Sequence, residues 1–289
     1  MATRHTGGQS FDFGTRYLFG RSARFRSMLD AWQRAGLVAA WHPDLPEAAL
    51  QHVRDSPLYK GVPEMMSVPK SLAAGLTVHL LKRVTAVRIA NGAWSVETEC
   101  GHYYMSQALV MTSPIPESLA LLEEGGVALP TKILTELRSV EYASCLALMV
   151  HLDGPSGLPS EGALALDGNP LTWIADHHLK GVASHPGAVT VYAGPEFSKQ
   201  MLHEPAEAVN QAMLRAARPL LKASVVSTQL HRWQYSQPVR TIQTSFMAAL
   251  DNPPLVLAGD AFGTGDCESA ALSGIEAADY LQSTYCPSR

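Results

Sequence analysis

The chain has 289 residues, of which 46% are hydrophobic and 17% are charged, and its mean hydropathy is close to zero. This composition is typical of a globular protein with a sizeable core, arranged as one large domain or two. The net charge of −4 argues against general nucleic-acid binding. The sequence has no run of about 18 apolar residues, so no membrane-spanning helix is predicted.

The N-terminal segment and the cysteines favour a cytoplasmic location. The chain begins MATRHTGGQSFDFG, which is polar and Gly-rich, so no signal peptide is expected. Cys100, Cys145, Cys267 and Cys286 are scattered and form no CxxC pair, and no histidine spacing supports a metal site. We therefore expect reduced thiols, each a small buried hydrophobic side chain, in a cytoplasm-like compartment.

The first quarter of the chain is predicted to contain a basic segment, a helix and a long loop. Residues 1–26 carry five arginines against one aspartate. Apolar residues at helical spacing predict a helix over 23–36, with Gly36 as its stop. Five prolines predict a loop over residues 42–69, of which 42–61 would connect parts of the fold, and a short helix follows near 66–76.

A meander of strands is predicted next. Residues 84–90 alternate, Asn91-Gly92 is a strong hairpin signal, and the return strand follows it. The strand QALVMT ends at Thr112-Ser113-Pro114, because proline cannot continue a paired strand.

The middle of the chain, residues 117–249, is predicted to form a mixed or antiparallel sheet with an amphipathic helix over PAEAVNQAMLRAARPLL. His177-His178 follows a predicted strand end, which favours a loop over a catalytic role. Trp233 and Tyr235 lie on one side of a long strand, where they would line a substrate pocket or pack in the core.

The segment PLVLAGDAFGTGDCESAALSGIEAADYL carries the clearest chemistry. A buried strand ends at Gly259-Asp260, and a helix is predicted from Glu268 to Leu281. Ligands bind at such strand ends, where Asp260 could accept hydrogen bonds from sugar or polyol hydroxyls and the N–H groups near Ser269 could support negative charge. Alternatively, Asp260 caps a turn and Gly274 packs against a sheet.

The N-terminal arginines have two interpretations as well. Arg4 and Arg16 could neutralise phosphates, whereas Arg21, Arg24 and Arg26 are better explained as a solvated helix face.

Six segments in order, from the N-terminal stretch through GVPEM, RVTAVRIANGAW, ALVMTSPIPE and HRWQYSQPV to LVLAGDAF…SGIEAA, resemble the renalase-like branch of the FAD-dependent amine oxidase superfamily. The resemblance implies FAD, an oxidoreductase activity and an NAD(P)-binding type of fold. It implies cofactor contacts by Arg4, Gly14, Thr15, Arg16, Val84, Thr112, Pro114, Gly259, Asp260, Glu268, Ser269 and Ala270. It implies substrate contacts by Tyr17, Trp233 and Tyr235, with no catalytic side chain and no metal.

The sequence departs from that family in two places. It contains no GxGxxG loop, and Met1 coincides with the Met of the family's Gly-Gly-Arg-Met run, so the first βαβ unit is expected to be missing. The start could be an internal Met of a longer chain, or the gene could be truncated. Such a chain would expose strand edges and bind FAD weakly. The second departure is Thr15-Arg16, where the family usually has Ala-Gln, so Arg16 could accept an anionic substrate or replace a neutral contact.

The expected fold class is α/β, with an incomplete Rossmann-like FAD-binding domain over 1–41, 62–116 and 250–289 and an α+β substrate domain over 117–249. The expected function is hydride transfer from a small donor of the dihydronicotinamide or amine class to flavin and then to oxygen. Alternatives are a non-catalytic remnant or binding protein without FAD, or a chain completed by another polypeptide. The oligomeric state is not predicted.

Overall fold

The computed structural model describes residues 1–43, 45 and 56–285, which fold as two compact units. The first unit comprises Met1–Leu76 and Ala143–Ser236, and the second comprises Thr77–Tyr142 and Gln237–Arg289. These bounds differ from those of the two predicted domains, because residues 1–76 pack with the large sheet. The assignment of a cofactor domain and a substrate domain therefore stays a prediction.

The first unit is organised around a five-stranded sheet of order β10-β11-β12-β9-β13. The pairs β10–β11, β11–β12 and β12–β9 are antiparallel. The strands are β9 (Glu141–Leu152), β10 (Ala163–Ala165), β11 (Leu171–Asp176), β12 (Ala188–Ala193) and β13 (Val225–Arg240). The prediction of one such sheet in the middle of the chain is confirmed.

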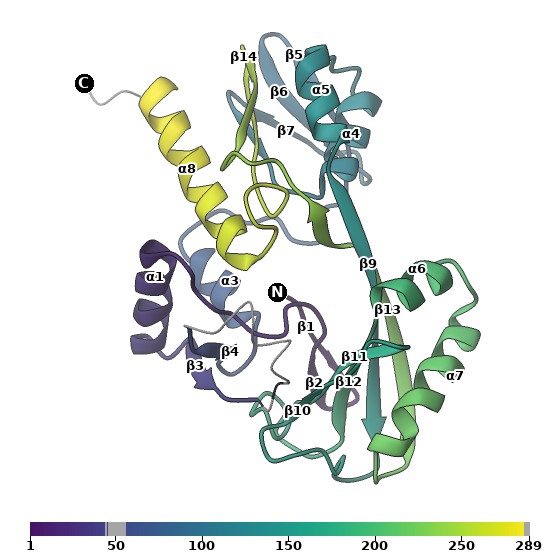
Figure 1. Ribbon diagram of the computed structural model, residues 1–289. Coiled ribbons are helices and arrows are strands. Elements are labelled where there is room, and N and C mark those ends of the chain that lie inside the picture. The colour runs from purple at the N-terminus through teal and green to yellow at the C-terminus, as the bar shows by residue number, and fades with distance from the viewer. Residues whose placement is uncertain (44, 46–55, 286–289) are drawn as a thin grey trace. The chain divides into compact units, whose positions relative to one another are not determined.

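Both faces of this sheet are covered. Leu146, Leu148 and Val150 of β9 pack with α7 (Ala206–Ala217), which follows α6 (Pro195–Met201), and Figure 1 shows both helices on one side of the sheet. A single-turn 3-10 helix, η1 (Arg218–Leu220), follows α7. Ala147 and Met149 point to the other face, where Phe11 and Phe13 pack. The alternation follows from the two-residue period of a strand.

Among the described residues, the N-terminal part of this unit contains two antiparallel strand pairs and two helices. Its elements are β1 (Thr3–Thr6), β2 (Gln9–Asp12), α1 (Ala23–Arg34), β3 (Val38–Trp41), β4 (Leu58–Gly61) and α3 (Ser67–Leu72). The predicted helix is confirmed as α1, and the Ser22 Oγ accepts a hydrogen bond from the Phe25 N–H at 3.1 Å to begin it. The prediction of a loop through residue 61 is wrong for β4, which pairs with β3. Residues 44 and 46–55 of the predicted loop lie outside the described residues.

The second unit contains two three-stranded sheets. The meander is β5 (Val84–Ala90), β6 (Ala93–Thr98) and β7 (Tyr103–Ser106), and the other sheet has the order β14-β15-β8. Its strands are β8 (Leu109–Met111), β14 (Met247–Asp251) and β15 (Pro254–Leu257). The hairpin at Asn91-Gly92 is confirmed, since both residues have the positive φ that such a turn requires (52° and 75°).

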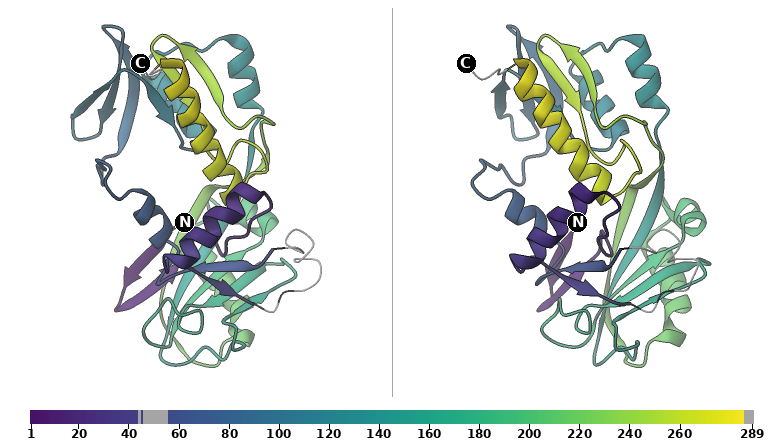
Figure 2. Two further views of the ribbon diagram at one scale, coloured as in Figure 1. Left: turned by 90° about the vertical axis from the view of Figure 1, so that its left-hand side faces the viewer. Right: turned by 60° about the vertical axis from the view of Figure 1, so that its left-hand side comes forward.

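Helices complete this unit: α4 (Ile115–Glu124), α5 (Thr131–Arg138) and α8 (Cys267–Tyr285). The last of these confirms the predicted C-terminal helix, and Ala277 on it packs against Val256 of β15 and the adjacent Ala258. Figure 2 shows α8 beside the β14–β15 hairpin in both views. The α/β class, with mixed and antiparallel sheets, is thereby confirmed. Within the described residues, no helix combines the length and the apolar character that crossing a membrane requires.

Candidate functional site

The parallel pair β15–β8 brings two predicted site segments to one edge. Leu257 is paired with Met111, and the Ala258 N–H donates to the Met111 oxygen at 3.0 Å. Thr112 and Gly259 therefore follow side by side at the carboxyl ends of both strands. Gly259 has a φ of 125°, and an added Cβ would lie 3.4 Å from the Thr112 oxygen. This backbone conformation favours glycine, and the edge is where α/β sheets bind ligands.

Asp260 presents a half-buried carboxylate next to this edge. Burial raises the pKa of its carboxyl above the ordinary value, while hydrogen bonds from the N–H groups of Asp260 and Ala261 act in the opposite direction. Within the described residues, no cationic side chain forms an ion pair with it. A partly desolvated carboxylate without a cation retains acceptor capacity for a ligand hydroxyl.

The beginning of α8 is capped from within. The Ser269 N–H donates to the Asp266 Oδ1 at 3.0 Å, the Asp266 N–H donates to the Ser269 Oγ at 2.9 Å, and the Ala270 N–H donates to the Asp266 oxygen. The two amide groups that were expected to face a ligand are therefore engaged in the cap. Glu268 is buried here. The proposed contacts of Ser269 and Ala270 would have to use other atoms.

Of the Ser-Gly pair within this helix, the structure gives a role to Ser273. The Ser273 Oγ accepts a hydrogen bond from the Gly259 N–H at 2.9 Å, and Ser273 is buried. The helix is thus tied to the strand end that carries Asp260. At Gly274, an added Cβ would meet no described atom within 4 Å, so packing against a sheet does not account for this glycine.

The remaining predicted residues of this unit lie around the same core. Val84, at the start of β5, packs against the cluster that contains Met111 and Leu257. Pro114 precedes α4, and its oxygen accepts a hydrogen bond from the Ser118 N–H at 3.0 Å. The edge of the parallel pair thus collects Thr112, Gly259 and Asp260, while Val84 and Pro114 belong to elements that support it.

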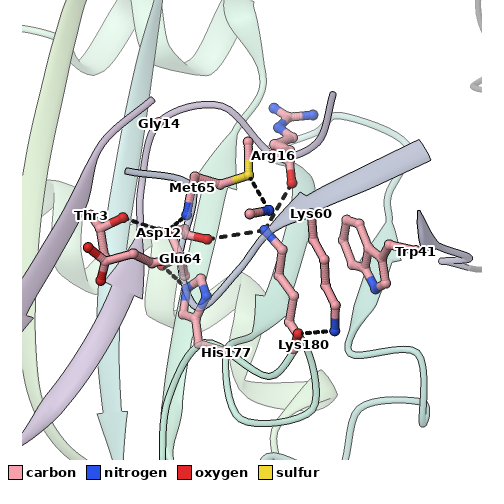
Figure 3. Close-up of polar contacts among 12 residues, drawn as sticks. Thr3, Asp12, Gly14, Arg16, Trp41, Lys60, Glu64, Met65, His177 and Lys180 are labelled. Carbon is pink, nitrogen blue, oxygen red and sulfur yellow. Dashed lines mark hydrogen bonds and ion pairs between the residues drawn. The ribbon is translucent and has the colours of Figure 1, made fainter. Parts of the chain in front are cut away.

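In the first unit, a fully buried lysine anchors the segment that includes Gly14 and Arg16 (Figure 3). The Lys180 Nζ lies 3.3 Å from the Asp12 Oδ2 and donates to the main-chain carbonyl oxygen of Arg16 at 3.0 Å. The side chains of Lys180 and Asp12 are each only 2% exposed. Burial lowers the pKa of Lys180, and the charge of Asp12 opposes that shift. The ammonium also lies 4.9 Å from the ring centroid of Trp41.

Asp12 and Tyr192 fix the same segment from two further directions. The second Asp12 oxygen accepts hydrogen bonds from the Thr3 Oγ1 at 2.7 Å and the Met65 N–H at 3.2 Å (Figure 3). The buried Tyr192 hydroxyl lies 3.1 Å from the main-chain carbonyl oxygen of Asp12 and 3.3 Å from that of Gly14. Sequence reasoning missed Asp12 and Lys180, which make the most buried ion pair among the described residues.

Arg16 and Tyr17 lie on an aromatic surface. The Arg16 guanidinium is 4.9 Å from the Tyr192 ring centroid and 5.6 Å from that of Trp173, and its Nη2 donates to the Thr172 Oγ1 at 3.2 Å. The Tyr17 ring lies 5.9 Å from Trp173, and burial raises the pKa of its hydroxyl. These two predicted contacts are therefore neighbours.

Arg4 and Trp233 both contact one phenylalanine. The Trp233 ring stacks on Phe13 at 5.5 Å, and its Nε1–H donates to the Phe13 oxygen at 2.9 Å. The Arg4 guanidinium lies 4.8 Å from the same ring centroid. Tyr235, two residues along β13, accepts a hydrogen bond from the Gln234 side chain at 3.1 Å. Thr15 lies half-buried between Gly14 and Arg16.

His177 lies in the turn after strand β11, as predicted, and its side chain is buried in the core. Its Nε2 is 2.7 Å from the Thr190 Oγ1, and burial lowers its pKa to about 4. It is therefore neutral near pH 7 and does not contact solvent. Among the residues the structure describes, no cluster of His, Cys, Asp or Glu side chains could hold a metal ion.

The predicted site residues thus divide between the two compact units. Arg4, Gly14, Thr15, Arg16, Tyr17, Trp233 and Tyr235 lie in the first, and Val84, Thr112, Pro114, Gly259, Asp260, Glu268, Ser269 and Ala270 lie in the second. The strand end of the second unit presents a half-buried carboxylate that can accept hydrogen bonds from hydroxyl groups.

Comparison with known proteins agrees with this geometry. Renalase of Mus musculus is 24% identical over 212 residues, which cover 69% of this chain and 62% of that protein. Among crystal structures, a proposed protoporphyrinogen oxidase of Exiguobacterium sp. 255-15 is similar, with a TM-score of 0.58 and 19% identity over 78% of this chain and 53% of that one. An oxidoreductase of Methanosarcina mazei has a TM-score of 0.51 and 14% identity, with 78% and 56% covered.

The chain thus spans less than two thirds of the length of these relatives, and the structural likenesses show the fold alone. A broader match covers residues 7–282, which is nearly the whole sequence, and it is to the family described as flavin containing amine oxidoreductase. A flavin, FAD, is the cofactor that this family and the renalase relative support. The chain belongs to the flavin containing amine oxidoreductase family.

Proposed function

We propose that this protein is an FAD-dependent oxidoreductase that takes a hydride from a small organic donor of the dihydronicotinamide or amine class and delivers the electrons to oxygen. The observation that carries the proposal is the Gly259–Asp260 strand end, held by Ser273 beside Thr112, in a chain of the flavin containing amine oxidoreductase family. When bound, FAD supplies the hydride acceptor and the route of two electrons to oxygen, with peroxide as the product.

The residues of this chain would bind and orient the cofactor. Asp260 would accept a hydrogen bond from a ribityl or ribose hydroxyl, because its carboxylate is half-buried and forms no ion pair with a Lys, Arg or His side chain among the described residues. Val84 would flank the adenine, and Thr112 and Pro114 would border the strand end. For the first unit, the family resemblance implies cofactor contacts by Arg4, Gly14, Thr15 and Arg16.

No side chain is assigned as an acid or a base. A dihydropyridine donor needs no proton abstraction before it releases a hydride, so substrate binding and exclusion of water would be the protein's main tasks. Tyr17, Trp233 and Tyr235 are the aromatic side chains proposed to contact the donor. An amine donor would require its nitrogen to be neutral, which solvent can provide.

The test is a titration of FAD with the purified full chain, in which quenching of the flavin fluorescence measures binding. We expect saturable binding that Asp260→Asn weakens by about tenfold, as loss of one charge-assisted hydrogen bond predicts. Glu123→Gln, an exposed change in the same unit, should leave the affinity unchanged. A folded chain with no FAD affinity would contradict the proposal and favour the non-catalytic alternative.

The donor class is tested with the FAD-loaded protein. Consumption of oxygen with a dihydronicotinamide nucleotide and not with benzylamine would support the first donor class, and the reverse result would support the second. Loaded protein that reduces oxygen with neither donor would overturn the proposed activity while leaving the cofactor assignment in place.

A further inference from the structure

Arg16 carries a positive charge for which the described part of the chain provides no acidic partner. Within the described residues, no carboxylate lies within ion-pair distance of its guanidinium, although the residue is half-buried. Its nearest groups are the Thr172 hydroxyl, the Cys145 thiol and the rings of Tyr192 and Trp173. A partly desolvated cation in such surroundings attracts an anion more strongly than an arginine in open solvent.

The contacts of the guanidinium leave part of its hydrogen-bonding capacity for a ligand. Its polar side-chain partners among the described residues include the Thr172 hydroxyl and the Cys145 thiol. The planar fork of an arginine has five N–H donors, and it matches the two oxygens of a carboxylate or phosphate. The rings of Tyr192 and Trp173 lie 4.9 Å and 5.6 Å from the guanidinium carbon and accept no conventional hydrogen bond from it.

The position of Arg16 is fixed through its main chain. Lys180 donates to its main-chain oxygen at 3.0 Å, and the Lys180 charge is itself compensated by Asp12. Tyr192 holds the neighbouring Gly14 through its oxygen at 3.3 Å. In Figure 3 the Arg16 side chain points away from this buried network. A charged side chain on an immobilised backbone loses little entropy when it binds a ligand, which is a property of preorganised sites.

A half-buried aromatic side chain, Tyr17, lies next to Arg16. Its ring is 5.9 Å from that of Trp173, which the Arg16 guanidinium also contacts. Tyr17 retains exposed surface, so a planar ring can pack on it while its charged group reaches the guanidinium.

We propose that Arg16 and the neighbouring Tyr17 form a binding site for an aromatic anion, and that Arg16 selects carboxylates or phosphates over neutral molecules of the same shape. This inference names the substrate class and rests on the proposed function for its catalytic meaning. It assigns the charged end of the donor to Arg16, in place of the cofactor contact that the family resemblance implies for this residue.

The experiment measures binding to the full chain without FAD, by isothermal titration calorimetry, of three probes that share a phenyl ring. Benzoate and phenyl phosphate carry an anion, and benzamide is neutral. We expect both anions to bind at least about tenfold more tightly than benzamide, with an affinity that falls as salt is raised. Arg16→Gln should remove that preference, and benzamide binding should stay the same.

Arg21→Gln is the matched control, because the Arg21 guanidinium also lies over a ring, 5.0 Å from the Phe19 centroid, but the residue is exposed. It should leave the preference for anions within about twofold of the unmodified chain. Arg16→Lys keeps the charge without the planar fork and should give an intermediate preference. Because it retains a cation at the same place, it also serves if Arg16→Gln fails to fold.

The outcomes separate this inference from the proposed function. Equal affinity for benzoate and benzamide, or an anion preference that survives in Arg16→Gln, overturns the site. Anion binding that depends on Arg16 in a chain without FAD affinity would support the site and contradict the flavin-dependent activity. FAD binding without anion selectivity would contradict the Arg16 site and support the proposed flavin-dependent function.

Discussion

The two compact units use buried charge in opposite ways. In the first unit, Asp12 is buried and is paired with Lys180, and its second oxygen accepts two more hydrogen bonds. In the second unit, Asp260 is half-buried, and no cation among the described residues pairs with it. A carboxylate whose two oxygens are both engaged within the fold holds a structure together, whereas one with open positions can bind a ligand.

The two units also differ in how much of their apolar surface is covered. The sheet of the first unit is covered on both faces, by α7 and by the N-terminal segment. The second unit leaves large apolar side chains exposed on its strands, including Tyr103, Met105 and Val110. We infer that the first unit is the more stable one and that the ligand-directed groups of the second unit depend on fewer supporting contacts.

The largest expected effect comes from breaking the buried pair. Lys180→Met leaves Asp12 buried without its cation, which should lower the free energy of unfolding by about 3–5 kcal/mol. Urea denaturation followed by circular dichroism measures the change. The double variant Asp12→Asn with Lys180→Met should recover part of the loss, because no charge then remains unpaired.

The control for that experiment lies in the second unit. Arg240 and Glu141 form an ion pair at 3.7 Å with side chains 63% and 66% exposed. Arg240→Gln should cost less than about 1 kcal/mol, since solvent and salt screen such a pair. Equal losses for the two variants would show that the buried pair is not a special support of the first unit.

A smaller effect is expected where α8 holds the strand end. Ser273→Ala removes the acceptor of the Gly259 N–H and should cost about 1–3 kcal/mol of stability. It should also weaken FAD binding, since Gly259 then loses the contact that fixes its position next to Asp260. Ser283→Ala, on an exposed turn of the same helix, should change neither quantity. An FAD affinity that tolerates Ser273→Ala would separate the strand end from the cofactor.

Local patterns in the sequence predicted the elements but not the pairings that make the site rigid. Alternation and turn residues sufficed for the sheet of the first unit and for the hairpin at Asn91-Gly92, because both signals are local. The segment Leu58–Gly61 was missed as a strand, since four residues show no periodicity and its partner β3 is not adjacent to it in the chain.

The candidate site was predictable only where one strand end meets a helix. Gly259 and Asp260 stood out because their order in the chain is that of a strand–helix junction. Asp12 and Lys180 are 168 positions apart and carry no local signal of their pairing, so only the fold could reveal it. The Gly-Gly pair at positions 7 and 8 could have indicated the β1–β2 hairpin that positions Asp12.

Two cysteines differ in the pKa of their thiols, and substitutions around them should affect folding least. Hydrogen bonds with Thr98 and then His102, whose Nδ1 is 3.0 Å from the Sγ, lower the pKa of the exposed Cys100 thiol to about 6. Burial instead raises the pKa of Cys145 in the first unit. The thiolate is the reactive form, so alkylation of Cys100 by iodoacetamide should accelerate as pH rises through about 6 and then level off near neutral pH, while Cys145 reacts slowly throughout.

Peptide mapping by mass spectrometry after short exposures resolves the two sites. His102→Gln should move the Cys100 profile to higher pH, because an imidazole that favours the thiolate is lost, and it should leave the unfolding free energy nearly unchanged at this exposed turn. A Cys100 profile centred on the ordinary thiol pKa would mean that the contacts of the turn do not persist in solution. Asp260 differs from Cys100 in being partly desolvated, so we expect substitution of Asp260 alone to alter cofactor affinity.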